Sequence, residues 1–396
     1  MKKLSSKLHL FLGLLTGAVF ALVCLTGAIV AFTEEALNIA NREHLHVTPR
    51  NTPKVPMETV LETYRKAYPK EMVFVMNEYR QPDRAYDFFS AVQNEKNPDA
   101  FGGYKMVYAD PYTGKILHVD KGTLEFLVLA VGLHTTLLMG DFGHDLIRYC
   151  TLLFFVQLVA GVILWWPRNG AALNGAVRVK WNSGKRRRLY DSHRTLGFYA
   201  AAGLLVMVAT ALFMSWTWIS RPVTAAFGGE PSLIHDHDEE HAHERRKEGP
   251  EFSLQALGQR VFAEQPGANQ LTYNLPFPDT AATVTVLTHS GSTFLNFAVG
   301  TPQEFDRVTG EKDMSPEARG EARNAKIFAT NLLIHMGFWG GTPTKILYFI
   351  LGLMGASLPV TGFFLWYGKY KRRKAGRIVP DDEEALEAQD AKLERA

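Results

Sequence analysis

Four histidines stand at the borders of long apolar segments in this sequence, an uncommon place for an ionisable side chain. His9 and His193 lie near the start of two such segments, and His134 and His335 lie shortly before two others. An ionisable residue in or beside a membrane span is a candidate for function, because placing it in lipid is costly. Imidazole can ligate a metal or a haem iron, or it can anchor a helix and hydrogen-bond to a neighbouring one.

The histidines recur at matched positions of an internal repeat. A shift of 201 residues aligns three residue types: His134 with His335, Gly161 with Gly362 and Trp165 with Trp366. A shift of 184 residues aligns three more: His9 with His193, Gly13 with Gly197 and Thr26 with Thr210. Such a repeat implies a pseudo-two-fold axis that pairs His9 with His193 at one depth and His134 with His335 at another. Two facing imidazole pairs are what two bis-histidine b-type haems require.

The apolar segments predict a polytopic membrane protein. Four runs reach or approach the roughly 20 residues that cross a hydrocarbon core; we expect spans at 8–32, 145–167, 193–219 and 345–368. The first run exceeds the roughly 7–15 apolar residues of a signal peptide, so we expect it to be retained. The net charge of +3 argues against nucleic-acid binding. Cys24 and Cys150 lie in or beside apolar runs and predict no disulfide.

Basic residues predict the orientation in the membrane. They gather in the loop 168–192, in "KYKRRK" at the start of the tail 369–396 and at the N-terminus. Loops rich in lysine and arginine stay in the cytoplasm, so both termini are expected there. The segments 33–122 and 220–344 then lie outside, and 123–144 is expected to be an interfacial helical region.

The two outer segments resemble each other. Residues 56–69 and 252–266 each have helical spacing of apolar residues, and Ser253 is a plausible N-cap. Each helix precedes strand-forming stretches and an aspartate-containing turn ending in Thr-Gly, "ADPYTGKIL" or "FDRVTGEKD". The expected fold is a membrane α-helical protein with four transmembrane helices in two repeats and two small extracytoplasmic α+β domains.

Four short motifs occur in a fixed order with the apolar segments: "LTGAIVAF", the "ADPYTGKIL" turn, "ILWWPR" and "DSHRTLGF". Together they resemble the PepSY-associated transmembrane family, and the resemblance covers about residues 4 to 374. The family includes inner-membrane ferric-siderophore reductases with a di-haem core. The second copy departs from the pattern, since Arg307 stands where Pro111 does and Ala211 replaces a glycine.

The resemblance implies a haem-dependent oxidoreductase of the bacterial inner membrane. Two b-type haems per chain would be held by His9 with His193 and by His134 with His335. Electrons would come from a quinol or a cytoplasmic flavoprotein and pass to an outside acceptor, namely a ferric siderophore or another oxidised compound. There is no C-x-x-C-H for covalent haem and no dinucleotide fingerprint, so a separate donor is expected.

Other residues are open to two interpretations. Four glycines near the histidines suit either a flat macrocycle or close helix packing: Gly13, Gly17, Gly197 and Gly203. Arg148 and Arg194 could pair with haem propionates, although interfacial anchoring is the favoured role. His144 aligns with Lys345 and so lacks a repeat partner.

A second histidine cluster lies in the outer segment 220–344. His235, His237, His241 and His243 alternate with carboxylates and could bind a metal ion, or form a solvated polar loop. Two other functions remain open, a membrane-anchored regulator of an extracytoplasmic peptidase and a metal-uptake accessory protein. Neither explains the matched histidines, and the spans carry almost no acidic residues.

Overall fold

The computed structural model describes residues 2–94, 97–120, 122–167, 173, 175–234, 249–275, 282–290 and 300–374. The chain divides into two compact units. The helical unit comprises 1–25, 145–208 and 350–396, and the sheet unit comprises 26–144 and 209–349. Because the long helices run through both, each unit is built from segments distant in sequence.

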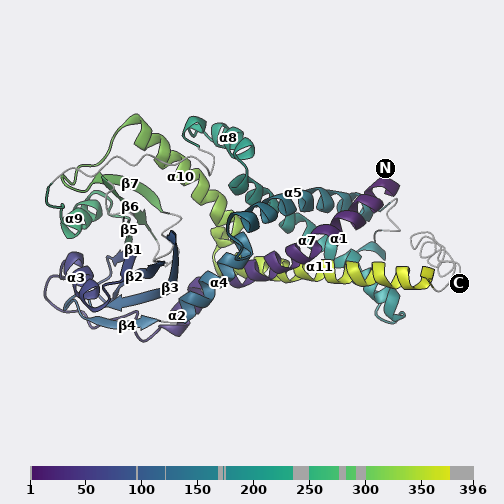
Figure 1. The fold of residues 1–396 in the computed structure, drawn as a ribbon, viewed down its shortest axis with the longest axis horizontal. Coiled ribbons are helices and arrows are strands. Elements are labelled where there is room, and N and C mark those ends of the chain that lie inside the picture. Colours follow the sequence, from purple (N-terminus) through teal and green to yellow (C-terminus); the bar gives the residue numbers. More distant parts are fainter. Residues whose placement is uncertain are drawn as a thin grey trace. The chain divides into compact units, whose positions relative to one another are not determined.

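Four helices among the described residues are long and apolar enough to cross a membrane (Figure 1). They are α1 (Lys2–Val30), α5 (Gly140–Trp165), α7 (Lys185–Ser215) and α11 (Thr342–Lys374). Each overlaps one predicted span, and α7 and α11 extend beyond theirs into basic sequence. The chain is therefore a multi-pass membrane protein whose apolar helix surfaces contact lipid.

Small residues bring the helices of the helical unit together. A Cβ atom added at Gly17 of α1 would lie 3.1 Å from Cβ of Pro359 in α11. One added at Gly203 of α7 would lie 2.3 Å from a methyl carbon of Leu351, also in α11. Without a hydrophobic driving force between helices in lipid, such close approach is what allows dispersion contacts to hold them. These glycines therefore serve helix packing.

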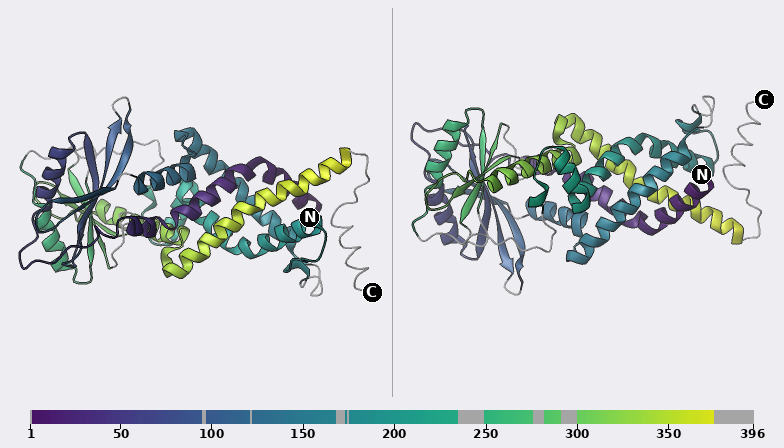
Figure 2. Two further views of the ribbon diagram at one scale, coloured as in Figure 1. Left: turned by 90° about the horizontal axis from the view of Figure 1, so that it is seen from below. Right: turned by 90° about the horizontal axis from the view of Figure 1, so that it is seen from above.

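The sheet unit contains one seven-stranded antiparallel sheet with the order β4-β3-β2-β1-β5-β6-β7 (Figures 1 and 2). The strands are β1 (Glu71–Tyr79), β2 (Tyr86–Asn94), β3 (Asn97–Ala109), β4 (Ile116–Asp120), β5 (Gln270–Asn274), β6 (Thr283–His289) and β7 (Thr301–Asp306). The sequence predicted two separate small domains, whereas the structure joins their strands through the β1–β5 pair. The physical reason is a buried polar seam: Asn77 accepts hydrogen bonds from Gln270 (3.0 Å) and Thr272 (2.6 Å).

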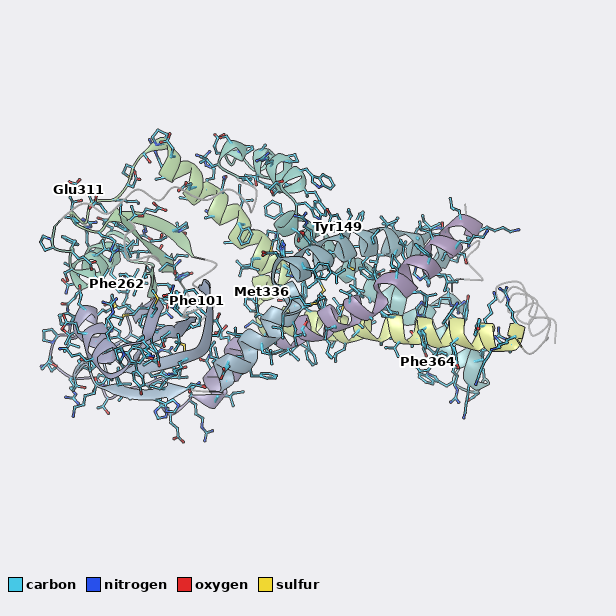
Figure 3. All side chains as sticks on the ribbon, viewed as in Figure 1. Phe101, Tyr149, Phe262, Glu311, Met336 and Phe364 are labelled. Carbon is cyan, nitrogen blue, oxygen red and sulfur yellow. The ribbon has the colours of Figure 1, made fainter. Side chains whose placement is uncertain are left out.

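Two helices cover one face of this sheet. The helices α3 (Met57–Ala67) and α9 (Leu254–Glu264) pack together against it, and Val60, Tyr64 and Val261 are fully buried there. Ser253 caps α9 by accepting a hydrogen bond from the Ala256 amide, as predicted. In Figure 3, Phe262 of α9 and Phe101 of β3 lie on opposite sides of the sheet.

The two predicted Thr-Gly turns have the same local structure. Asp110 accepts a hydrogen bond from the Tyr112 amide at 2.8 Å, and Asp306 accepts one from the Val308 amide at 2.9 Å. Gly114 and Gly310 close the turns with φ of 70° and 68°, a conformation that glycine adopts without steric cost. Each turn follows a strand of its own copy, which supports the internal duplication.

The remaining helices connect the sheet to the spans. They are α2 (Thr33–Ala40), α4 (Thr123–Thr136), α8 (Thr217–Ala226), α10 (Pro316–His335) and the 3₁₀ turns η1 (Pro231–Leu233) and η3 (Phe338–Gly340). Leu124 and Leu127 of α4 pack with Leu37 against Met106 and Tyr108 of β3, while α10 packs on β7. Each half of the sheet thus supports one helix that carries a candidate histidine near its C-terminal end. The strand-forming stretches predicted from the sequence are 71–79, 104–110, 283–290 and 293–299. The first three form β1, part of β3 and β6, and the last lies outside the described residues. No such stretch was predicted for the other strands, among them β2 and β5.

Candidate functional site

The structure brings the four histidines together in the two pairs that the repeats predict. In the helical unit, the rings of His9 on α1 and His193 on α7 have centres 6.2 Å apart, with planes inclined by 76°. In the sheet unit, His134 on α4 and His335 on α10 also have ring centres 6.2 Å apart, with planes inclined by 59°. We call these the inner pair and the outer pair.

This separation matches the space for one iron between two imidazoles. A histidine nitrogen lies about 2.0 Å from a bound metal, and the ring centre lies about 1.1 Å behind that nitrogen. Two rings ligating one iron from opposite sides therefore have centres about 6.2 Å apart. A direct imidazole–imidazole hydrogen bond of about 2.9 Å would bring the centres to about 5.1 Å. The ring-centre distance in both pairs thus equals that expected for axial haem ligation and exceeds that of a direct hydrogen bond.

Hydrogen bonds fix the tautomers of the inner pair. His9 Nδ1 lies 3.0 Å from the backbone carbonyl oxygen of Gln157, so Nδ1 must be the protonated, donating nitrogen. His193 Nδ1 lies 2.8 Å from the hydroxyl of Thr361. That hydroxyl donates its proton to the carbonyls of Ser357 and Leu358, each at 3.0 Å, so it must accept from His193. In both rings Nε2 is left as the nitrogen suited to ligate a metal.

Threonine hydroxyls lie beside both rings of the outer pair. Thr26 lies 3.3 Å from His134 Nδ1, and Thr210 lies 3.0 Å from His335 Nδ1. Asn331, one helical turn before His335, donates to the Thr210 carbonyl at 3.0 Å and so fixes α10 against α7. The two threonines are repeat partners. Each ring of the outer pair therefore has the same kind of contact, with a repeat-related threonine hydroxyl.

Glycines give three of the rings room. A Cβ atom added at Gly27 would lie 2.8 Å from Cε1 of His134. The corresponding distance is 3.0 Å between Gly161 and His9, and 3.3 Å between Gly362 and His193. For the fourth ring, His335, the residue that corresponds to Gly27 in the second repeat is Ala211, directly after Thr210. These contacts belong to Gly27, Gly161 and Gly362, whereas Gly13, Gly17, Gly197 and Gly203 meet other helices.

A buried ion cluster lies in the sheet unit at the start of α11. Lys345, which is 7% exposed, bonds Glu35 at 2.9 Å and Glu34 at 3.3 Å. Burial raises the pKa of the Glu34 carboxyl, and the Lys345 ammonium opposes that rise. Lys345 also lies 4.2 Å from the centre of the Phe338 ring. Sequence reasoning did not anticipate that these two glutamates share one lysine.

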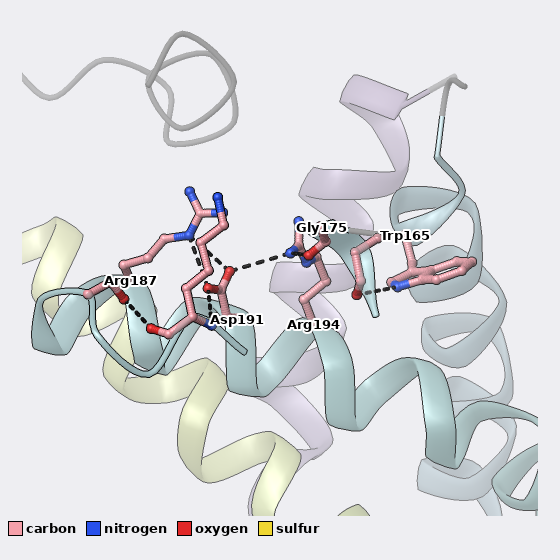
Figure 4. Close-up of polar contacts among 8 residues, drawn as sticks. Trp165, Gly175, Arg187, Asp191 and Arg194 are labelled. Atoms are coloured by element: carbon pink, nitrogen blue, oxygen red, sulfur yellow. Dashed lines mark hydrogen bonds and ion pairs between the residues drawn. The ribbon is translucent and has the colours of Figure 1, made fainter. Parts of the chain in front are cut away.

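The arginines considered for propionate binding have protein partners. Arg194 bonds the Gly175 carbonyl and lies 3.4 Å from Asp191, which is fully buried (Figure 4). Arg187 donates to both oxygens of the same carboxylate at 3.0 and 3.1 Å. Arg148 pairs with Asp145 at 3.3 Å. These contacts support the anchoring role.

Sequence reasoning missed Gln157 and Thr361 as partners of the histidines. Gln157 accepts through its backbone carbonyl, which carries no residue-type signal. The Thr361 hydroxyl did offer a signal, since polar residues in a membrane usually have a partner. The four histidines of the predicted metal cluster, His235, His237, His241 and His243, lie outside the described residues. Within the described part of the chain, no group of three or more histidine, cysteine or acidic residues could hold a metal ion.

Fold and site together define a duplicated four-span membrane protein with paired histidines and a sheet built from both repeats. The family model described as the PepSY-associated TM region matches residues 6–369. The chain therefore belongs to the PepSY-associated transmembrane family. No curated protein matches it.

Proposed function

We propose that this protein is an electron-transfer protein of the bacterial inner membrane that holds two b-type haems. The observation that carries the proposal is the 6.2 Å separation of the ring centres in both histidine pairs. His9 and His193 would hold one haem, and His134 and His335 the other. Bound haem would supply reversible one-electron transfer between ferric and ferrous iron.

The chain's own residues would orient and tune the ligands. Gln157 and Thr361 accept the Nδ1 protons of His9 and His193, which fixes the ring tautomers. An accepting group on the far nitrogen makes imidazole a stronger donor to iron and stabilises the ferric state. Gly27, Gly161 and Gly362 leave room for the imidazole rings at positions where a Cβ atom would crowd them.

Under this proposal the protein carries electrons from a quinol or a cytoplasmic flavoprotein to an acceptor outside. Following the family resemblance, that acceptor is ferric iron held by a siderophore. The enzyme would then be a ferric-chelate reductase, with the basic ends of the spans in the cytoplasm and the sheet outside.

The test is the visible spectrum of the detergent-purified protein, oxidised and dithionite-reduced, with haem quantified per chain. We expect two low-spin b-type haems in the wild type. Changing His9 and His193 together to Ala should leave one haem, and so should changing His134 and His335 together. His144→Ala is the matched control, because this histidine has no repeat partner, and it should retain both.

A colourless protein from a haem-sufficient host would overturn the proposal. That outcome would favour the regulator of an extracytoplasmic peptidase. Retention of both haems in either double variant would show that other residues ligate them.

A further inference from the structure

Two arginines lie on the helix faces that carry the inner pair. Arg186 of α7 precedes His193 by seven residues. Arg372 of α11 follows Thr361 by eleven residues, and the Thr361 hydroxyl lies 2.8 Å from His193 Nδ1. With 3.6 residues per turn, both seven and eleven residues bring a helix back to within about 20° of the same face. Each arginine therefore lies in line with the inner pair, about two or about three turns along its helix.

The two guanidinium groups meet at one end of the helical unit. They are close enough for their charges to repel each other. At 1.5 Å per residue, Arg186 lies about 10.5 Å from His193 along α7, and Arg372 lies about 16.5 Å from Thr361 along α11. Side chains lean towards the N-terminus of a helix, so Arg372 leans back towards Thr361 while Arg186 leans away from His193. Because like charges repel, an anion between these two groups would be stabilised.

The Arg372 side chain has unused hydrogen-bonding capacity. Its Nε is buried and has no hydrogen-bond partner among the residues that the structure describes. Buried polar groups nearly always have a partner, so an orphaned N–H group indicates that a ligand binds there. A guanidinium group matches the geometry of a carboxylate or a phosphate, to which it donates two parallel hydrogen bonds. The missing partner is therefore expected to be an oxyanion.

Other basic residues near this end have partners within the protein. Lys2 is the repeat counterpart of Arg186, and its Nζ donates to the Trp166 carbonyl at 3.1 Å. The arginines beside Asp191 share its carboxylate (Figure 4). Basic residues are common at the cytoplasmic ends of spans. That rule does not require two of them to converge on the faces that hold the inner pair.

We propose that Arg186 and Arg372 bind the propionate carboxylates of the haem held by His9 and His193. The inference rests on the proposed function and adds the residues that orient the macrocycle in the inner site. Haem b carries two propionates on one edge, and two guanidinium groups match their charge. The two positive charges would also favour the ferrous state, because reduction removes one positive charge from the iron.

The first test compares haem with its dimethyl ester, which lacks both carboxylates. Full-length protein with the outer pair changed to alanine keeps only the inner site, and it is purified without haem. Each compound is then titrated into this background protein in detergent and followed by Soret absorbance. The test variant is Arg186→Gln/Arg372→Gln. Lys185→Gln/Arg373→Gln is the matched control, because it removes the same charge from exposed neighbours on other faces of the same helices.

We expect Arg186→Gln/Arg372→Gln to weaken the binding of haem about tenfold or more, since charge-assisted hydrogen bonds are lost. The dimethyl ester should bind this variant as tightly as it binds the background protein. The control variant should bind both compounds as the background protein does. If the arginines instead hold a lipid phosphate or pack the helices, the variant should bind both compounds equally weakly, and that result would overturn the inference.

Midpoint potentials of the holoprotein with both haems supply a second measurement, which does not depend on the alanine background. Arg186→Gln/Arg372→Gln should lower the potential of the inner haem and leave that of the outer haem unchanged. Lys185→Gln/Arg373→Gln should change neither, because solvent screens exposed charges. A loaded Arg186→Gln/Arg372→Gln protein with an unchanged inner potential would overturn the inference. Failure of the proposed function is distinguishable, because it appears as a wild type that binds no haem.

Discussion

His9 Nδ1 donates to the Gln157 carbonyl oxygen at 3.0 Å, and the repeat counterpart of this carbonyl, that of Leu358, is hydrogen-bonded to His193. The second ring has a further contact, because the hydroxyl of Thr361 lies 2.8 Å from His193 Nδ1 and donates to the Leu358 carbonyl. The two halves of the inner pair thus use the same backbone position, and one of them adds a side chain. Ala160 stands at the position that corresponds to Thr361, so His9 has no such hydroxyl.

This difference predicts that Thr361→Val acts on one site only. The change keeps the side-chain shape but removes the hydroxyl that contacts His193 Nδ1, a contact that His9 lacks. Losing such a partner typically weakens metal binding about 10–100-fold. Because the ferric state benefits most from a strongly donating imidazole, the inner midpoint potential should rise, by about 59 mV for each tenfold selective loss.

Spectroelectrochemical titration of the holoprotein checks this prediction. Thr361→Ser should restore the wild-type potential because it returns the hydroxyl. Thr210→Val should shift the other haem instead, since Thr210 contacts His335. An unchanged potential in Thr361→Val would show that the hydroxyl has no influence on the ligand.

The glycines beside the rings predict a graded loss of haem in three glycine-to-alanine variants. An added Cβ would meet Cε1 of the ring at 2.8 Å in Gly27→Ala, 3.0 Å in Gly161→Ala and 3.3 Å in Gly362→Ala. Alanine normally stabilises a helix by about 1 kcal/mol over glycine, so any loss reports the clash with histidine. We expect haem occupancy to fall most at the outer site in Gly27→Ala and least in Gly362→Ala.

Haem per chain after purification, resolved by site in the reduced spectrum, measures this series. Gly368→Ala is the control on α11, because an added Cβ there meets nothing within 4 Å. Equal occupancy in all four variants would mean that the rings can shift at no cost.

The sequence predicted which histidines lie next to each other, because residue types recur at fixed offsets in the two repeats. It could not predict the bond from His9 to Gln157, since a backbone carbonyl carries no residue-type signal. The pairing of β1 with β5 also escaped prediction. It joins Asn77 to Gln270 and Thr272, nearly 200 residues away, and such contacts leave no local pattern. Propensity predicted both Thr-Gly turns because their chemistry is local.

The buried position of Asp191 predicts that removing its carboxylate destabilises the helical unit. Its carboxylate is fully buried and bonds Arg187 and the backbone amide of Lys180. Removing one partner of a buried ion pair leaves unpaired charge, at a cost of about 3–5 kcal/mol when burial is complete. Because the arginines are 12% and 21% exposed, we expect Asp191→Ala to cost about 2–3 kcal/mol.

Thermal unfolding in detergent, followed by circular dichroism, measures the loss. Asp145→Ala is the matched control, since Asp145 is 54% exposed and pairs with Arg148 at the three-residue spacing that separates Asp191 from Arg194. A surface pair contributes at most about 1 kcal/mol, so this variant should melt close to wild type. Equal melting temperatures for the two variants would contradict a structural role for Asp191.

The burial of His289 predicts that the sheet unit loses stability against unfolding in acid. This last residue of β6 is 7% exposed, and its Nε2 has no hydrogen-bond partner in the described part of the chain. Burial lowers the pKa of His289 to about 4, below the ordinary value of 6.5. The folded state therefore binds this proton less readily than the unfolded state. The resulting stability is present above pH 6.5 and is lost as the pH falls towards 4.

Between pH 7 and pH 5 the protonation of this single group should lower the free energy of unfolding of the wild type by about 2 kcal/mol. For a unit of this size that corresponds to a fall of about 4–8 °C in melting temperature. His289→Gln removes the titration, so its melting temperature should fall less over the same range. The buried Asp87 and Glu78 act in the opposite direction, because burial raises the pKa of each carboxyl. Both remain in the variant, so the difference between the two proteins isolates His289.

Scanning fluorimetry at pH 5, 6 and 7 supplies the measurement, with His46→Gln as the control. The His46 side chain is 57% exposed and pairs with Asp83 at the surface, so its removal should leave the pH dependence close to that of the wild type. If the wild type and His289→Gln lost stability in parallel between pH 7 and pH 5, His289 would not be the group that titrates.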